Sequence, residues 1–478
     1  MRRARGIWLG ILAFALVVAS SAAAGGPDTT RPAGGPGLTF NVDSEADLID
    51  IQPGNGHCVA SNGKCTLRAA IMETNKLTGD DLVNVPAGHY VLSLMGGGPD
   101  ERHGDLDTTD DLTLSGAGAR ITVIDANQID RVIQSSADLM ISGVTIENGQ
   151  VADEGGGIWA LNSLKVESSI VRNNTALLDI GGGIWAQDFL TLSNSTVYGN
   201  EATTNCSMAP CNVGIGGGIF VGNIALPAFL NISNSTIHGN KASRQAGLYL
   251  NDVGIRLVTG STISGNTNTI PGNGSAGIGG TTPDLERTII AGNNAGPDCE
   301  EGNSNGHNLD SDDSCGLSAV AGDGDVPNGD PKLAPLRYNG GLTLTRALRA
   351  GSDAFNAAGA CTGSDQRGYA RPQGAACDIG AFEARICFGR PETVSGNNQS
   401  ETLNGTAGID AIVGGGGNDT LNGLDGDDRL CGEDGDDELK GGAGADRFNG
   451  GDGTDECRGG PNADILPATG CETTISIP

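Results

Sequence analysis

The middle of the chain is an internal repeat with a period of about 26 residues. The segment GGGIWA occurs at residues 155–160 and again at 181–186, and Trp159 and Trp185 are therefore 26 residues apart. Within each unit apolar and polar residues alternate, as in LTLSNSTV at 190–197, which is the period of a β-strand and not of a helix. One such unit, with two or three short strands, cannot bury its own apolar face. Stacked units bury a continuous core, so the repeat predicts the rungs of a parallel β-helix.

A polar side chain recurs at a fixed place in these units. One turn of the repeat carries an asparagine in each unit, at Asn174, Asn200, Asn240, Asn266 and Asn293. Asparagine tolerates a left-handed backbone and can stack on the asparagine of the next rung, so we expect a structural role.

An aromatic position in the repeat has two possible orientations. Trp159, Trp185 and Phe220 occupy it in successive units. We expect these rings to stack inside the β-helix core. If they face outward instead, they predict a carbohydrate-binding surface.

A short segment before the repeats has the pattern of a cap. In CTLRAAIMETNK (65–76), four residues share one helical face, which predicts a short amphipathic helix over the open end of the solenoid: Leu67, Ala70, Ile71 and Thr74. The segment resembles the CSLREA motif of exported bacterial β-helix proteins, with Ala69 in place of the glutamate. The GGGI and asparagine repeats are similar to those of polymorphic outer-membrane proteins.

That resemblance covers residues 38–385 and implies a right-handed parallel β-helix at the cell surface or outside the cell. It also implies that three later segments are terminal rungs: NGHNLDSDDSC (305–315), DPKLAPLRYNGGLTLTRAL (330–348) and DQRGYARPQGAACDIGAFE (365–383). It implies no catalytic site, because fold and function are separable.

The C-terminal region has a second repeat, a nine-residue frame that runs unbroken from Gly396 to Pro467 in eight units. Position six is acidic throughout: Glu401, Asp410, Asp419, Asp428, Asp437, Asp446, Asp455 and Asp464. Position eight is apolar: Leu403, Ile412, Leu421, Leu430, Leu439, Phe448, Cys457 and Leu466. Glycines allow left-handed turns whose carbonyls converge on a cation, while an aspartate supplies a hard anionic oxygen. The position-eight side chains point inward and form a thin core.

The frame matches G-G-x-G-x-D-x-U-x and resembles the calcium-binding nonapeptide of RTX proteins. The resemblance implies a parallel β-roll with two nonapeptides per turn and Ca²⁺ as its cofactor, held between turns by side chains 18 residues apart. These pairs would be Asp410 with Asp428, Asp419 with Asp437, Asp428 with Asp446, and Asp437 with Asp455. The implied metal site consists of Asp410, Asp419, Asp428, Asp437, Asp446 and Asp455 with the turn glycines Gly414, Gly415, Gly417, Gly423, Gly426, Gly432, Gly435, Gly441, Gly442 and Gly444. The end units match less well, so Glu401 and Asp464 are left out of that set.

The charge of this region explains why a cation would matter. Residues 396–467 contain 16 Asp and Glu against 4 Lys and Arg, and only about one apolar core residue per unit. Such a core cannot offset the entropy of ordering the backbone, so we expect the region to be disordered without cations. The whole chain has a formal charge of -30, which argues against binding to nucleic acid or anionic lipid and favours divalent cations as partners.

Several features predict export. Residues 1–24 have the basic start, apolar run and small-residue cleavage site of a signal peptide, and no later stretch is long enough to span a membrane. Residues 25–37 are expected to be a disordered leader. The chain contains 12 cysteines, an even number that predicts disulfides in an exported protein. Spacing favours pairs between Cys58 and Cys65, Cys206 and Cys211, Cys299 and Cys315, and Cys361 and Cys377; Cys387, Cys431, Cys457 and Cys471 remain, of which the last two are the nearer pair.

The sequence thus predicts an all-β, secreted or cell-surface protein with a right-handed parallel β-helix (38–385), a linker (386–395), a β-roll (396–467) and a tail (468–478). A structural, adhesive or glycan-binding role that depends on calcium is favoured, with a polysaccharide or cell-surface glycan as the second partner. The alternative is a polysaccharide lyase or glycoside hydrolase acting in the β-helix groove.

The enzyme alternative has few residues to support it. The basic candidates on the rungs are Arg172, Arg256 and Arg287. The G-x-S-x-G match at 302–306 lies beside His307 in a polar loop, without the strand and helix of a nucleophile elbow. No catalytic residue is therefore assigned. Clustered arginines and carboxylates on one strand face would favour the enzyme, and a face of Asn, Ser and Thr would favour the binding protein.

Overall fold

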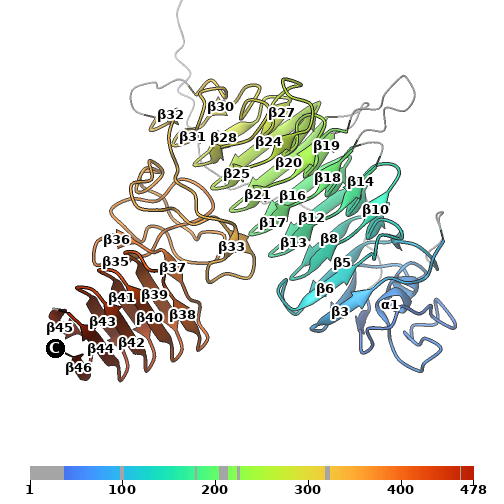
Figure 1. Ribbon diagram of the computed structural model, residues 1–478. Coiled ribbons are helices and arrows are strands. Elements are labelled where there is room, and N and C mark those ends of the chain that lie inside the picture. The colour runs from blue at the N-terminus through green and yellow to red at the C-terminus, as the bar shows by residue number, and fades with distance from the viewer. Residues whose placement is uncertain are drawn as a thin grey trace, which may run out of the picture.

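The computed structural model describes residues 37–96, 102–177, 180–203, 214–222, 227–317, 323–462 and 464–477. The expected signal peptide, the leader up to residue 36 and the Cys206–Cys211 pair lie outside these residues. The fold consists of two stacks of parallel strands, which Figure 1 shows with a loop-rich segment between them.

The larger stack is a parallel β-helix built from four sheets. Sheet 1 has ten strands: β1 (Thr39–Asn41), β2 (Asp81–Val85), β5 (Leu112–Gly116), β8 (Leu139–Ser142), β12 (Ser163–Glu167), β16 (Phe189–Ser193), β20 (Ala228–Ser233), β24 (Val253–Thr259), β28 (Asp284–Glu286) and β30 (Asn303–Ser304). Sheet 2 has ten: β3 (Gly88–Val91), β6 (Thr122–Asp125), β9 (Thr145–Glu147), β13 (Ile170–Arg172), β17 (Thr196–Tyr198), β21 (Thr236–His238), β25 (Thr262–Ser264), β29 (Ile289–Ala291), β31 (Leu309–Asp310) and β32 (Val326–Pro327).

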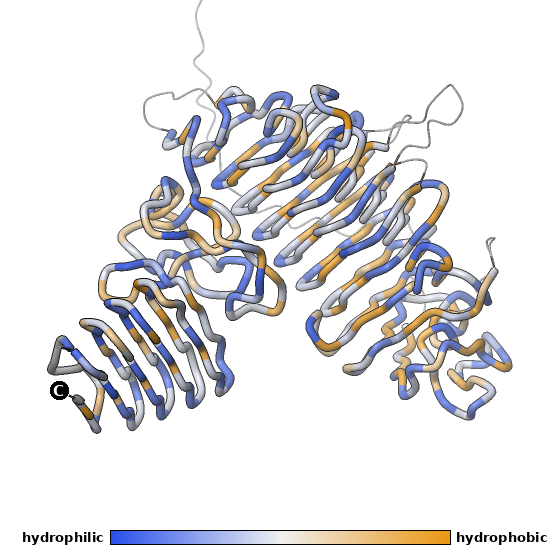
Figure 2. Tube along the Cα trace, in the orientation of Figure 1, coloured by the Kyte–Doolittle hydropathy of each residue, from blue (hydrophilic) through white to orange (hydrophobic). Residues whose placement is uncertain are grey.

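The other two sheets complete each rung. Sheet 3 has seven strands: β4 (Leu106–Thr108), β7 (Ile133–Ser135), β11 (Ile158–Ala160), β15 (Ile184–Ala186), β19 (Ile219–Gly222), β23 (Leu248–Asn251) and β27 (Ile278–Gly280). Sheet 4 has five short strands: β10 (Gln150–Val151), β14 (Thr175–Ala176), β18 (Glu201–Ala202), β22 (Lys241–Ala242) and β26 (Thr267–Asn268). A central rung therefore has four strands rather than two or three. Apolar positions recur from rung to rung and line one continuous core (Figure 2).

The predicted asparagine ladder is confirmed. Asn174 donates from both its backbone N–H and its side-chain amide to Oδ1 of Asn200, each at 3.0 Å, and Asn200 makes the same pair of bonds to Asn240. The ladder continues through Asn266 and Asn293. The left-handed residue of this turn is not the ladder asparagine itself but the residue before it, such as Asn173 at φ 55°.

The helix α1 (Leu67–Thr74) lies at the N-terminal end of the β-helix, with Leu67, Ala70 and Ile71 in the core as expected (Figure 1). Its polar side is also buried, which the amphipathic pattern did not predict. Arg68 donates to the carbonyls of Gly104 and Asp105, both at 2.8 Å, and Glu73 accepts the backbone N–H groups of Gly54 and Gly56. Because backbone groups of the surrounding loops form hydrogen bonds with Arg68 and Glu73, the helix is covered on both sides.

The aromatic residues correct the expectation of an internal stack. Ile158 and Ala160 point into the core and Trp159 lies between them on the strand, so Trp159 faces outward. The rings of Trp159 and Trp185 are parallel to within 8° and 5.2 Å apart on the outer face of sheet 3. On the same face, Phe220 packs at 5.3 Å against Tyr249.

Residues 333–385, here named the covering segment, correct a second expectation. The stretches 330–348 and 365–383 do not form terminal rungs, whereas 305–315 does, through β31. The covering segment contains the antiparallel pair β33 (Arg337–Tyr338) and β34 (Leu344–Thr345) and folds back over the outer face of sheet 2. Gln366, for example, donates to the carbonyl of Ser195 and accepts from the hydroxyl of Thr236.

Five disulfides are present among the described residues. Four join the pairs favoured by spacing, namely Cys58–Cys65, Cys299–Cys315, Cys361–Cys377 and Cys457–Cys471, which confirms those predictions. The fifth joins Cys387 to Cys431. No helix in the described part of the chain has the length and apolar character needed to cross a membrane.

Candidate functional site: the calcium-binding roll

The smaller stack is a β-roll of two five-stranded parallel sheets. One contains β37 (Val394–Ser395), β39 (Ala411–Gly416), β41 (Arg429–Asp434), β43 (Arg447–Asp452) and β45 (Ile465–Thr469). The other contains β38 (Thr402–Asn404), β40 (Thr420–Asp425), β42 (Glu438–Ala443), β44 (Glu456–Pro461) and β46 (Thr473–Ile477). Paired residues such as Leu421 and Leu439 are 18 positions apart, so two nonapeptides make one turn, as the resemblance implied.

The roll extends beyond the frame read from the sequence. Within 386–395, expected as a linker, Ile386–Cys387 (β35) and Arg390–Pro391 (β36) form an antiparallel pair and β37 joins the roll. Residues 468–478, expected as a tail, contain the end of β45 and all of β46. The core is the predicted position-eight column: Ile412, Leu421, Leu430, Leu439, Phe448 and Cys457.

The turns of the five central units, residues 414–458, have a left-handed backbone at positions two and four. In the unit that begins at Gly441, Gly442 has φ 106° and Gly444 has φ 153°. Leu424 and Glu433 hold position two with φ 81° and 77°, which is strained for residues with a side chain. The glycines of the repeat are therefore explained by turn geometry.

Each predicted aspartate uses one carboxylate oxygen to join neighbouring turns. Oδ1 of Asp428 accepts the backbone N–H of Asp410, and Oδ1 of Asp437 accepts that of Asp419, both at 2.8 Å. The same bond links Asp428 to Asp446 at 2.9 Å. Residues 18 positions apart, which the sequence pairs as sharing an ion, are thus adjacent in the structure.

The second oxygen of these carboxylates is buried and unused. Among the described residues, Oδ2 has no hydrogen-bond partner in Asp419, Asp428, Asp437, Asp446, Asp455 and Asp464. The position-one glycine leaves the space in front of it: a Cβ at Gly432 would lie 2.1 Å from Oδ2 of Asp437, and one at Gly441 the same distance from Oδ2 of Asp446. A buried anionic oxygen without a donor is costly, and a cation is the partner that matches it.

The electrostatics agree with that conclusion. Burial, with additional repulsion from neighbouring carboxylates, raises the pKa of Asp419, Asp428, Asp437 and Asp446 to about 6. Backbone N–H donors oppose the rise but do not cancel it. These groups therefore carry a penalty for ionising that a bound Ca²⁺ would remove, because a cation favours the charged form.

The three acids at the start and end of the roll differ from one another in how their carboxylate oxygens are used. Asp410 is in the predicted set, but its Oδ2 accepts from the backbone and hydroxyl of Thr406 and its Oδ1 from the hydroxyl of Thr393. Glu401 binds the backbone and amide of Asn397, in keeping with its exclusion. Asp464, excluded because its unit is irregular, has the same unpartnered oxygen as the central aspartates. Its place in the nine-residue frame was the signal that could have included it.

No three acidic side chains converge in the described part of the roll, so an ion there would take its remaining oxygens from backbone carbonyls or water. Carboxylate and carbonyl oxygens suit the hard ion Ca²⁺. The donor set present therefore fits the ion.

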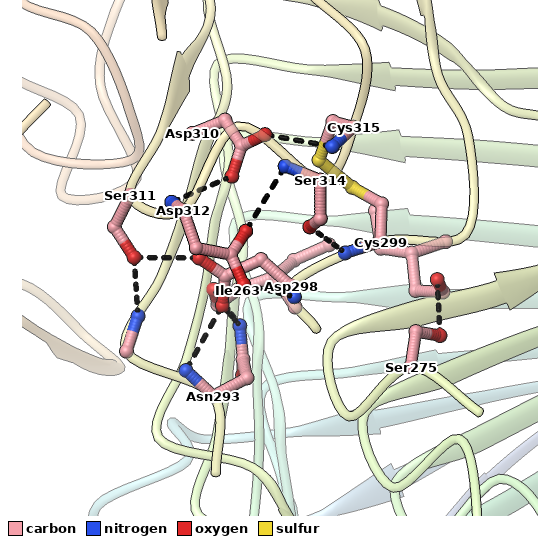
Figure 3. The surroundings of a disulfide bond; sticks show 12 residues. Ile263, Ser275, Asn293, Asp298, Cys299, Asp310, Ser311, Asp312, Ser314 and Cys315 are labelled. Carbon is pink, nitrogen blue, oxygen red and sulfur yellow. Dashed lines mark hydrogen bonds between the residues drawn. A yellow bond between two sulfur atoms is a disulfide. The ribbon is translucent and has the colours of Figure 1, made fainter. Parts of the chain in front are cut away.

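An acidic loop beside the Cys299–Cys315 disulfide differs from the roll, because three acidic side chains do lie close together there (Figure 3). Asp298, Asp310 and Asp312 converge there, but all six of their oxygens accept hydrogen bonds, for example Asp298 Oδ1 from Asn293 and Asp310 Oδ2 from the backbone of Cys315. Burial raises the pKa of Asp310 to about 7, so this carboxyl holds a proton more readily than an exposed aspartate does. Asp298 ends the asparagine ladder.

The basic residues considered for catalysis are used structurally. Arg256 donates to the carbonyls of Val253 and Gly254, and Arg287 pairs with Glu286 at 2.6 Å. Although burial acts in the opposite direction, hydrogen bonds to Tyr198 and Glu147 raise the pKa of Arg172, so it stays charged. His307 contacts the carbonyl of Ala357 through Nδ1.

Comparison with known families agrees with the geometry of the roll. A family model described as RTX calcium-binding nonapeptide repeat (4 copies) matches residues 395–430 and 432–466. No curated protein and no solved structure matches the chain. The C-terminal units are therefore RTX-type nonapeptide repeats, and such repeats bind calcium.

Proposed function

We propose that this chain is a secreted or cell-surface structural protein whose β-roll folds and locks when it binds calcium outside the cell. The observation that carries the proposal is the column of buried aspartate oxygens without donors in the roll. The central aspartates Asp419, Asp428, Asp437, Asp446 and Asp455 are the proposed side-chain ligands, with Asp464 added and Asp410 held by threonines instead.

The energetic argument is one of linkage. The roll places buried carboxylates in columns around a core of one side chain per nonapeptide. Extracellular calcium sites have dissociation constants of roughly 10⁻⁴ to 10⁻³ M, so millimolar calcium adds about 1 kcal/mol per site. Several sites acting together would make the roll ordered outside a cell and unstable at the low calcium concentration inside.

Calcium titration of the whole secreted chain tests this proposal. We expect strands β39–β44 to gain protection from hydrogen–deuterium exchange cooperatively in the millimolar range of calcium, while the rungs β11–β25 stay protected throughout. Magnesium is the control, because it prefers a smaller octahedral site and keeps its water. Protection of the roll that is the same in EDTA and in 10 mM calcium would contradict the proposal.

For the β-helix we propose an adhesive role through a glycan. Support comes from the outer face of sheet 3, where the partly buried Trp159 stacks on the nearly buried Trp185. It also comes from sheet 1, where Phe189 is 47 % exposed and stacks on the partly buried Phe229, with rings 4.8 Å apart and parallel to within 3°. Flat aromatic faces of this kind are typical linings of ligand sites. The CSLREA-like cap and the polymorphic outer-membrane-type repeats point to the same surface-exposed class.

Tryptophan fluorescence tests the glycan proposal directly. The chain has three tryptophans, and Trp8 lies in the expected signal peptide, so the mature protein reports on Trp159 and Trp185 alone. We expect a cell-wall or capsular polysaccharide preparation to shift the emission of the wild type and not of Trp159→Ala. Retention on the polysaccharide that is equal for the two proteins would place the binding elsewhere.

The lyase or hydrolase alternative receives no support from the three basic residues considered, since each already has a structural partner. The covering segment also packs on the outer face of sheet 2, against Ile170 of β13 and Ile289 of β29. The non-catalytic function is therefore the one that the residues favour.

A further inference from the structure

The first three rungs of sheet 2 bring together three metal-ligating side chains outside the roll. His89 on β3, Asp125 on β6 and Glu147 on β9 come from adjacent strands, and one ligand atom of each lies within 4.8 Å of the others. His89 Nε2 is already 3.1 Å from Asp125 Oδ2. The covering segment packs along this face from Ala119 onward, and the His89 side chain is 56 % exposed.

The two carboxylates are positioned by neighbours that leave an oxygen available. Asp125 Oδ1 accepts the backbone N–H of Asn127 at 2.7 Å and the amide of Asn148 at 3.0 Å, so its Oδ2 is directed to His89. Glu147 Oε2 accepts from Arg172, whose guanidinium is itself held by Tyr198 at 3.1 Å. Partners of this kind orient the ligands in known metal sites.

Two carboxylates face each other at this site. Asp125 and Glu147 are directly opposite each other on neighbouring strands, a position where like charges are destabilising. Arg172 pairs with only one of the two carboxylates. A cation between the three side chains would satisfy the remaining carboxylate.

We propose that His89, Asp125 and Glu147 form a site for a divalent transition-metal ion, with Zn²⁺ as the reference ion. The imidazole nitrogen distinguishes this donor set from the all-oxygen roll and favours zinc over calcium. Ligand atoms in a tetrahedral zinc site are about 3.3 Å apart, given metal–ligand distances of about 2.0–2.1 Å. The His89–Asp125 contact already has this spacing, and the exposed imidazole can close on Glu147. Three protein ligands leave at least one coordination position for water or a ligand oxygen.

Isothermal titration calorimetry with zinc chloride tests the site on the full chain in saturating calcium, so that the roll is already loaded. We expect one zinc equivalent for the wild type and at least a tenfold weaker affinity for His89→Ala. His57→Ala, which removes another exposed histidine in the cap region, is the matched control and should bind like the wild type.

Cobalt provides a second measurement with the same variants. Visible absorption of bound Co²⁺ should appear in the wild type and in His57→Ala and be lost in His89→Ala. Equal zinc binding by the wild type and His89→Ala would overturn the proposal, because it would place the ion at other residues. The absence of any zinc binding in saturating calcium would overturn it as well.

Discussion

Each central aspartate of the roll divides its two oxygens between two tasks. Oδ1 accepts a backbone N–H of the neighbouring turn and so belongs to the fold, while Oδ2 is buried, unpartnered and available for a cation. As a proposed calcium ligand, the same residue would stabilise the roll when calcium is bound and destabilise it when calcium is absent. Substitutions at these positions should change sign with the metal.

Asp437→Asn tests this change of sign. The amide keeps the shape and the Oδ1 acceptor, but it removes the charge that would bind the ion. We expect the calcium concentration at the folding midpoint to rise by about tenfold, since ligand charge tunes affinity. In EDTA the variant should resist urea better than the wild type. Asp434→Asn removes an exposed carboxylate of the same unit, and its midpoint should stay close to that of the wild type.

Acidification provides a second test at the residue scale. Without calcium, Asp419, Asp428, Asp437 and Asp446 have a folded-state pKa of about 6, above the value of about 3.9 in an unfolded chain. The folded roll therefore binds protons more tightly than the unfolded one. Its stability in EDTA should be greatest below about pH 4 and be lost as the pH rises through 6. In calcium the dependence should reverse, because protons compete with the ion below pH 6. Urea midpoints of the roll that do not change between pH 4 and 7 in EDTA would contradict this prediction.

Leu424 provides a test of the turn geometry. It is 49 % exposed and has φ 81° at a position where four of the eight units have glycine. Replacing it with glycine relieves a left-handed backbone that costs roughly 1–2 kcal/mol for other residues, less the entropy that glycine adds to the unfolded chain. We expect Leu424→Gly to stabilise the calcium-loaded roll by up to about 1 kcal/mol in urea denaturation. Leu421→Gly, in the core on the same strand β40, should destabilise it.

At the scale of the elements, buried ladders hold the rungs in register. One ladder is the asparagine column, and a second is a column of serines. The backbone N–H groups of Ser169, Ser195 and Ser235 each donate to the serine hydroxyl of the next rung. Both columns provide acceptors for buried backbone N–H groups in the turns, which the strands do not pair. These ladders join each rung to the next at a fixed offset. The register of the β-helix therefore depends on side chains as well as on the sheets.

Asn200→Ala is the sharpest test of the ladder. The variant leaves the buried N–H of Asn174 without an acceptor and removes the donor to Asn240. An unsatisfied buried group costs about 1–3 kcal/mol, and the small cavity adds to it, so we expect a loss of roughly 2–4 kcal/mol in thermal or urea unfolding. Asn231→Ala, at an exposed site on sheet 1, should stay within about 0.5 kcal/mol of the wild type. Equal losses at the two sites would show that the ladder adds nothing.

At the scale of the whole molecule, the β-helix and the roll meet through a buried ionic junction. Arg385 binds Glu392 at 2.8 Å and reaches Glu433 of the roll at 2.9 Å, while Arg367 binds the other oxygen of Glu392. Burial alone would raise the pKa of Glu392, but Arg385 and Arg367 lower it, so Glu392 stays charged. Figure 1 shows the covering segment lying between the two stacks, where it supplies this junction.

The disulfide between Cys387 and Cys431 fastens the roll to that junction. It closes a loop with a sequence separation of 44, which on the chain-entropy model is worth about 4 kcal/mol. We expect the double variant Cys387→Ser, Cys431→Ser to need a higher calcium concentration to protect β39–β44 from hydrogen exchange. Cys58→Ser with Cys65→Ser, at the far end of the β-helix, should leave that concentration unchanged. An unaltered midpoint in the first variant would mean that the roll orders independently of its attachment.

The sequence by itself determined the parts of this protein that repeat. The strand class, the rung period, the asparagine ladder, the inward column of the roll and the position-six aspartates all follow from periodicity, because a repeated unit must present the same side chains to the same neighbours.

Only the tertiary structure decided the contacts between residues far apart in the chain. It turned Trp159 and Trp185 outward, laid residues 333–385 over sheet 2 and paired Cys387 with Cys431. It also separated Asp410 from its companions, because Thr393 and Thr406 happen to reach its carboxylate. Alternation along a strand shows that two faces differ but not which one is buried, and a segment without a period has no register to predict. The packing of unlike segments settles both.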